Sequence, residues 1–174
     1  MQWLGVRDWP SKSQVLTQME GIYFTWITAT CGAPESSHEG KTDTTKRING
    51  EIAKIEIKCN AFEIERLDEN GAVTYSIRNN DYIVYAPDYN EFAPVEMQAY
   101  VIPAGLFVDK LYECGCVRLK MTTPMAARKK AGEPFFYDRI SIQNNSIKKL
   151  NLIYDILDEY GMSLKEFKAM VCGA

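Results

Sequence analysis

The chain has 174 residues, 46% of them apolar, and a formal net charge of −3. This length and composition suit one domain, residues 1–174, whose ordinary core requires neither metal nor disulfide bonds. The negative charge argues against a protein that binds polyanions over its whole surface, although it allows a local basic groove. No apolar run approaches the roughly 20 residues that cross a bilayer and no signal peptide is evident, so we expect a cytoplasmic protein that does not contact membranes.

The cysteines and the histidine exclude most zinc sites. Five scattered cysteines lack the paired C-x-x-C spacing of such sites, so we interpret them as reduced thiols, with residues 114–116 (Cys-Gly-Cys) forming a turn. His38 is the only histidine, which excludes multi-histidine zinc sites unless a partner chain contributes. His38 itself is either a solvated loop residue or a phosphate contact.

A first helix is predicted after Pro10, capped by Ser11 or Ser13. Its apolar residues recur at helical spacing and are Val15, Met19, Ile22, Tyr23, Trp26 and Ile27. Glu20 lies on the flank of this apolar stripe, where it could reach the edge of a site. Residues 33–47 are polar and rich in turn formers, so they predict a loop that leads into the sheet.

The clearest strand is predicted over residues 52–59, where apolar and polar residues alternate. The alternation places the apolar side chains on one face and Lys54, Glu56 and Lys58 on the other. This strand therefore presents a carboxylate between two ammonium groups.

A pair of strands follows directly. Residues 62–67 and 72–77 are predicted to pair through a turn at residues 70–71, because Asn-Gly is a strong hairpin signal. Residues 81–86 are almost continuously apolar, which is typical of a strand covered on both faces.

The rest of the chain predicts one more strand and several helices. The strand spans residues 97–102, and a short helix is predicted over residues 104–110. Ser146 begins a longer helical pattern that stops at Gly161, and residues 163–166 (Ser-Leu-Lys-Glu) have the form of a capping box. The order of a helix, strands and further helices predicts an α/β fold with a mixed central β-sheet flanked by helices.

Glu56 and Lys58 are the residues best suited to chemistry. Two residues apart in a strand, they project from the same face. A carboxylate can hold a divalent cation that polarises a phosphoryl oxygen and lowers the pKa of an attacking water, while an ammonium can orient the water or offset charge on the phosphate. The same E-x-K pattern also suits an exposed strand face with an ion pair, so the surrounding sequence decides between these interpretations.

That surrounding sequence resembles the PD-(D/E)XK nuclease superfamily. A glycine-containing loop over residues 36–42 leads to Asp43, a turn follows at residues 49–50, and a strand then carries Glu56 and Lys58. This is the family pattern of an aspartate, a hairpin and a (D/E)-x-K strand.

The resemblance continues downstream. Residues 80–87 and 100–104 look like the next core strands of the family, and the likeness covers roughly residues 13–110. A C-terminal strand and helices are then expected over residues 111–174. Thr42 stands where the name of the superfamily suggests proline. This difference makes the resemblance to the family weaker but has less effect on the mechanism that the family implies.

The resemblance implies a restriction-endonuclease-like core and a Mg²⁺-dependent DNA endonuclease in which Mn²⁺ can replace Mg²⁺. Asp43 and Glu56 would bind the metal, and Lys58 would assist the attacking water. Glu20 is expected to complete the acidic shell, with Glu39 as its competitor because restriction enzymes of the superfamily can show a glutamate-glycine pair there. The family also implies duplex or branched DNA as substrate and a homodimer that cuts two strands.

A basic stretch is the candidate for binding the DNA backbone. Residues 118–130 contain five positive side chains and no acidic one, namely Arg118, Lys120, Arg128, Lys129 and Lys130. They form either a solvated face or a set of phosphate contacts that position a duplex. Arg78 is a weaker candidate of the same kind, and we expect Tyr112 and the aromatic residues 135–137 to pack rather than to stack on bases.

Other classes of function remain open from sequence. A Holliday-junction resolvase of the same superfamily is the alternative among enzymes, since junction recognition depends on loop geometry. A non-catalytic nucleic-acid-binding or assembly protein would have lost a ligand, whereas Asp43, Glu56 and Lys58 are all present. An accidental resemblance would leave a mixed α/β interaction domain whose final helices bind a partner.

Overall fold

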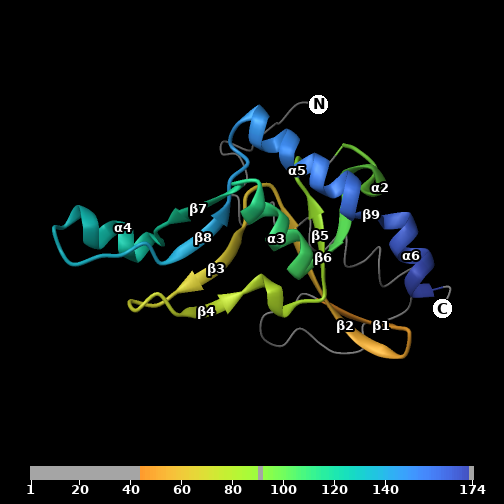
Figure 1. Ribbon diagram of the computed structural model, residues 1–174, viewed down its shortest axis with the longest axis horizontal. Coiled ribbons are helices and arrows are strands. Elements are labelled where there is room, and N and C mark those ends of the chain that lie inside the picture. The colour runs from red at the N-terminus through yellow and green to blue at the C-terminus, as the bar shows by residue number, and fades with distance from the viewer. Residues whose placement is uncertain (1–43, 90–91, 173–174) are drawn as a thin grey trace, which may run out of the picture.

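The computed structural model describes residues 44–89 and 92–172, and its strands form two sheets (Figure 1). The main sheet contains, in spatial order, β1 (Thr44–Ile48), β2 (Glu51–Cys59), β5 (Tyr82–Ala86), β6 (Tyr100–Pro103) and β9 (Met162–Ser163). The small sheet contains, in spatial order, β4 (Val73–Ser76), β3 (Glu63–Leu67), β8 (Arg139–Ile142) and β7 (Val117–Lys120). The chain is therefore a mixed α/β protein, but its strands are divided between two sheets where one was expected.

The β1–β2 hairpin begins the main sheet. Asn49 and Gly50 both have positive φ values, 51° and 85°, which suit the two-residue turn of an antiparallel hairpin. The predicted loop through residue 47 is wrong at its end, because residues 44–47 pair with β2 as an edge strand. Their polar composition concealed the strand, since an edge strand does not need an apolar sequence.

Two apolar clusters cover the faces of the main sheet. On one face, Ile57, Val84 and Phe167 pack together beneath α6 (Leu164–Cys172). On the other face, Phe107 of α3 (Ala104–Glu113) and Leu157 of α5 (Ile147–Tyr160) pack in one cluster with strand residues. β5, which is parallel to β2 and antiparallel to β6, is buried by both clusters, as its apolar sequence predicts.

Asn60 takes the chain from the main sheet into the small sheet. It adopts a left-handed conformation with φ of 53°, which asparagine tolerates better than most residues. The buried Tyr85 hydroxyl donates a hydrogen bond to the Asn60 carbonyl oxygen at 2.7 Å, and the Asn60 side-chain oxygen accepts one from the backbone N–H of Tyr89. Contacts from the core thus fix the direction in which β3 leaves β2.

An extension of the small sheet projects away from the main sheet, at the left of Figure 1. We define the arm as residues 121–138, which connect β7 to β8 and include α4 (Thr123–Lys130). No residue of α4 is buried. The backbone N–H and hydroxyl of Thr122 donate to the Asp138 carboxylate at 2.7 and 2.5 Å, which closes the base of the arm.

The ends of the C-terminal helices follow the sequence closely. The Ser146 hydroxyl accepts a hydrogen bond from the N–H of Lys149, and α5 ends at Tyr160, directly before Gly161. At the start of α6 both bonds of the predicted capping box form: Glu166 N–H to the Ser163 hydroxyl at 3.1 Å, and Ser163 N–H to the Glu166 carboxylate at 2.8 Å.

Two strand boundaries differ from the prediction. The strand expected over residues 97–102 begins only at Tyr100, because Pro94 starts a short helix, α2 (Val95–Gln98). The strand expected over residues 72–77 is shorter, since Ile77 begins a 3₁₀ turn, η1 (Ile77–Asn79), capped by the Ser76 hydroxyl.

Two other predictions concern larger parts of the chain. The first predicted helix lies outside the described residues, and the single-domain organisation stays a prediction. Within the residues that the structure describes, no helix is both long and apolar enough to cross a bilayer.

Candidate active site

Glu56 and Lys58 form an ion pair on β2, an internal strand of the main sheet. The Lys58 ammonium nitrogen lies 2.6 Å from Glu56 Oε1, and the two side chains are only 16% (Lys58) and 6% (Glu56) exposed. Alternation along the strand places both on one face, as predicted. Their burial was not predicted, because a strand face with charged residues at every second position normally faces water.

The surroundings of the pair are apolar on the side of β5. Glu56 is in register with Ile83, and Lys58 is in register with Tyr85. Both neighbours belong to the cluster beneath α3 and α5. A carboxylate and an ammonium in such a place attract each other more strongly than on an exposed surface. Removing either group destabilises the fold more, because the remaining charge stays buried.

The other residues predicted for the acidic shell cannot be compared with this geometry. Asp43, Glu20, Glu39 and His38 lie outside the described residues. Among the residues that the structure does describe, no group of three or more His, Cys, Asp or Glu side chains is placed to hold a metal ion. Glu56 is the predicted metal ligand whose position is known.

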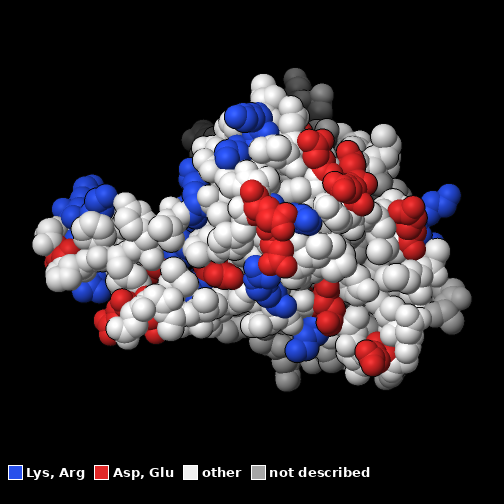
Figure 2. Space-filling model, viewed as in Figure 1, with Lys and Arg blue, Asp and Glu red and all other residues white. Residues whose placement is uncertain are grey.

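The predicted DNA-binding residues are divided between a strand and a helix. Arg118 and Lys120 lie on β7, and residues 128–130 form the last turn of α4. Lysine and arginine side chains are visible on the projecting arm in Figure 2. The sequence prediction treated these residues as one stretch, whereas the structure distributes them over two parts of the same extension.

A C-terminal cap fixes the end of α4. Gly132 has φ of 72°, its N–H donates to the Lys129 carbonyl, and the N–H of Glu133 donates to the Arg128 carbonyl. This pair of bonds is a Schellman motif. The chain then turns back so that the Lys129 ammonium lies 5.3 Å from the centre of the Phe135 ring. Basic residues in the last helical turn also interact favourably with the negative end of the helix dipole, which is a structural reason for their presence.

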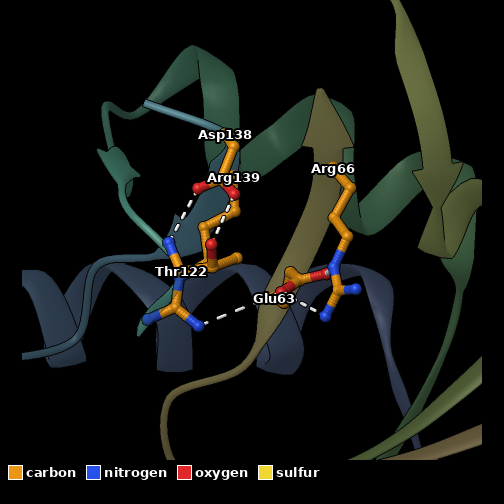
Figure 3. A network of polar contacts seen from close by, with 5 residues as sticks. All are labelled: Glu63, Arg66, Thr122, Asp138 and Arg139. Atoms are coloured by element: carbon orange, nitrogen blue, oxygen red, sulfur yellow. Dashed lines mark hydrogen bonds and ion pairs between the residues drawn. The ribbon is translucent and has the colours of Figure 1, made fainter. Parts of the chain in front are cut away.

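Sequence reasoning included Lys120 among the DNA-binding residues but missed the two arginines that lie beside it on the small sheet. Arg66, Arg139 and Lys120 are in register across the adjacent strands β3, β8 and β7. Residues that face each other across antiparallel strands share one face of the sheet, and we call this set the basic row. Figure 3 shows Glu63 between Arg66 and Arg139, at 2.7 Å from the first and 4.0 Å from the second. No local pattern reveals such a row, because it depends on which strands pair.

Several other expectations concern residues that the structure describes. Arg78 lies 2.7 Å from Asp109 and 3.7 Å from Glu65, so it joins η1 to α3 and β3, and its role as a phosphate contact stays a prediction. The packing prediction for the aromatic residues is wrong for three of them: Tyr112, Phe135 and Tyr137 are all exposed.

The cysteine turn is confirmed. Gly115 has φ of 70°, and Cys59, Cys114 and Cys116 are free thiols. Burial, reinforced by the neighbouring Cys114, raises the pKa of Cys116 to about 12. Its thiol is therefore protonated at neutral pH and is a poor nucleophile or metal ligand.

No protein-family model matches the chain, and no curated protein or solved structure matches it either.

Proposed function

We propose that the protein is a Mg²⁺-dependent DNA endonuclease with a restriction-endonuclease-like core, and that the Glu56–Lys58 pair is the centre of its active site. Asp43 and Glu56 hold the metal, Lys58 assists the attacking water, and Glu20 completes the acidic shell, with Glu39 as the alternative. The observation that carries the proposal is the 2.6 Å contact between two largely buried, oppositely charged side chains on an internal strand.

The pairing of β1 supports the choice of Asp43. Thr44, the first residue of β1, is in register with Ile55, directly beside Glu56 in the sequence. Asp43 directly precedes Thr44 in the sequence. The chain that follows Asp43 therefore enters the sheet at the level of Glu56.

The available oxygen atoms suit magnesium. Mg²⁺ keeps several of its waters and is commonly held by one or two carboxylates together with substrate phosphate oxygens. Glu56 provides one carboxylate in a setting that excludes most bulk water, and Asp43 is the second on our proposal. When bound, the metal polarises the phosphoryl oxygen and lowers the pKa of a coordinated water.

Lys58 has a distinct role in this scheme. Its ammonium stands beside the Glu56 carboxylate, where it can orient a water and offset the negative charge that develops on the phosphate. Apolar neighbours such as Tyr85 reduce the screening of that charge by water. The buried contact with Glu56 holds the Lys58 ammonium at the point where the phosphate would be attacked.

The family resemblance also suggests the partners of the protein and where it acts. DNA is the substrate, two copies of the chain form a homodimer that cuts both strands, and the protein acts in the cytoplasm. A Holliday-junction resolvase is the nearest alternative, and a non-catalytic DNA-binding protein on this fold is the alternative outside enzymes.

Incubation with DNA tests the proposal. Supercoiled plasmid and a four-way junction are each incubated with the protein in Mg²⁺, in Mn²⁺ or in EDTA, beside a Glu56→Gln variant. We expect metal-dependent cutting by the native protein and loss of cutting in the variant. Preferential cutting of the junction would favour the resolvase, whereas DNA binding without cutting in either metal would favour the non-catalytic protein.

A further inference from the structure

The exposed faces of the small sheet and the arm combine basic and aromatic side chains. The basic row brings Arg66, Arg139 and Lys120 side by side, with Glu63 as the carboxylate that contacts two of them. Like charges at facing positions of paired strands destabilise a sheet. A binding partner with negative charge would offset that cost.

Arg139 is held only loosely by the described residues around it. Its ion pair with Glu63 is 4.0 Å long, whereas the same carboxylate binds Arg66 at 2.7 Å. The Arg139 Nε–H is buried and has no hydrogen-bond partner in the part of the chain that the structure describes. A buried donor without an acceptor is costly. The Arg139 side chain is 33% exposed as a whole, so its guanidinium can also meet a phosphate oxygen, an acceptor of the kind that it prefers.

The aromatic side chains lie on the segment that leads into this row. Phe135 and Tyr137 are 42% and 45% exposed, while Phe136 between them is partly buried. The N–H of Leu67 donates to the Asp138 carbonyl, so the pairing of β3 with β8 continues beyond Arg139 towards the arm. Phe135 and Tyr137 therefore stand four and two residues before Arg139, on the segment that enters β8.

Hydrogen bonds order the arm on both sides of these rings. The Thr122–Asp138 hydrogen bonds close its base, as Figure 3 shows, and the Schellman motif at Gly132 fixes its far end. Exposed aromatic rings on an ordered segment beside cations suit an unpaired polynucleotide, whose bases stack on rings and whose phosphates contact basic side chains. A duplex offers phosphates but keeps its bases stacked inside.

We propose that the basic row and the rings of Phe135 and Tyr137 bind an unpaired DNA strand. If the protein is the nuclease proposed above, its substrate is then DNA in which an unpaired strand adjoins a duplex, as in tailed or branched DNA. The covalent chain keeps the two sites close together, because Glu63 is the fifth residue after Lys58 and their Cα atoms are at most about 18 Å apart. An unpaired strand on the small sheet would therefore lie within a few nucleotides of a phosphate at Lys58.

Fluorescence anisotropy in EDTA measures this binding without cleavage. The full chain is titrated against a labelled single-stranded oligonucleotide and against the same sequence as a duplex. We expect tighter binding of the single strand by the native protein, and a loss of about tenfold or more on that strand for the Phe135→Ala/Tyr137→Ala variant. Duplex affinity should change by less than about twofold.

Two further variants make the result specific. Phe92→Ala removes another exposed ring, 68% exposed and outside the small sheet and the arm, and should leave both affinities unchanged. Phe135→Leu/Tyr137→Leu keeps apolar side chains but removes the rings, and should lose single-strand affinity like the alanine variant. Because both rings are exposed, these variants should melt within a few degrees of the native protein.

The inference fails if the native protein binds the single strand no more tightly than the duplex, or if removing both rings leaves single-strand affinity unchanged. These outcomes are separate from the proposed nuclease activity. Single-strand binding with the expected variants but no cutting in Mg²⁺ would refute the nuclease and keep the inference. If the native protein cuts DNA but its ring variants bind single strands normally, the nuclease proposal is kept and the inference is refuted.

Discussion

Removing Lys58 and removing Glu56 should have unequal effects on stability. Lys58→Met leaves a carboxylate that is 6% exposed without the ammonium that faces it, and breaking a buried pair in this way costs about 3–5 kcal/mol. Glu56→Gln leaves an ammonium on a flexible stem that is 16% exposed and can turn towards water, so we expect a cost of about 1–2 kcal/mol. The double variant should recover part of the loss from Lys58→Met.

Thermal melting by circular dichroism reads out these differences. For a chain of this length, each kcal/mol shifts the Tm by about 2–4 °C. Lys58→Met should therefore melt about 6–20 °C below the native protein in EDTA. Equal and small effects of both single variants would show that the pair is in practice solvated, and would refute the reasoning from burial.

Divalent metal distinguishes an active site from a structural ion pair. A cation present at about 100 times its Kd stabilises the folded chain by about 2.7 kcal/mol, which is a Tm increase of about 5–11 °C. We expect this increase for the native protein and for Lys58→Met, which keeps the carboxylate and lacks a competing ammonium, but not for Glu56→Gln. The same increase in Glu56→Gln would place the metal elsewhere, and no increase in any of the three would indicate a structural pair.

Three further predictions concern the arm and α6. Replacing residues 128–130 by glutamine should weaken duplex binding whatever the DNA sequence. The slope of log affinity against log salt concentration, measured by titrations at several salt concentrations, should become shallower by about 0.9 for each phosphate that is no longer neutralised. An unchanged slope would show that these residues are only a solvated face. Burial raises the pKa of Asp138, but the hydrogen bonds from Thr122 outweigh it and the pKa lies below its ordinary value of 3.8. Its stabilisation is therefore complete above about pH 4 and is lost as the pH falls through the lowered pKa. The Tm difference between native protein and Asp138→Asn should shrink below about pH 4, and a difference that does not shrink as the pH is lowered would contradict this account. Ser163→Ala removes one bond of the capping box and should cost about 0.5–2 kcal/mol in urea unfolding, whereas an unchanged stability would mean that packing alone fixes the start of α6.

Local signals in the sequence were sufficient for much of the fold. The strand β2 follows from strict alternation, the turn at Asn49 and Gly50 from a residue pair that adopts positive φ, and the start of α6 from the spacing of Ser163 and Glu166. Each of these signals acts over a few residues, so the whole interaction is visible within a short stretch of sequence.

The division into two sheets was not predictable in this way. β3 pairs with β8, which lies far from it in the sequence, and the register between Arg66 and Arg139 follows from that pairing alone. The same holds for β1, whose polar residues become a strand only because β2 offers hydrogen-bonding partners. Long-range pairing is decided by tertiary packing, which local propensity does not encode.

The candidate site was predictable in its residues and not in its environment. Alternation alone placed Glu56 and Lys58 on one face. Their burial depends on β5 and on the apolar residues Ile83 and Tyr85, which come from a later part of the chain. That burial changes the expected energetics of the pair from those of a surface ion pair to those of a buried one.

The single-turnover cleavage rate of Lys58→Ala tests the central claim most directly, with Lys54→Ala as the matched control. Lys54 is the same type of residue on the same strand, two positions from Glu56 on the same face of β2, but it is exposed. At saturating DNA and Mg²⁺ we expect Lys58→Ala to cut about 10²- to 10⁴-fold more slowly than the native protein, and Lys54→Ala to cut at nearly the native rate. Cutting by Lys58→Ala at the native rate would contradict the assignment of the active site to the Glu56–Lys58 pair.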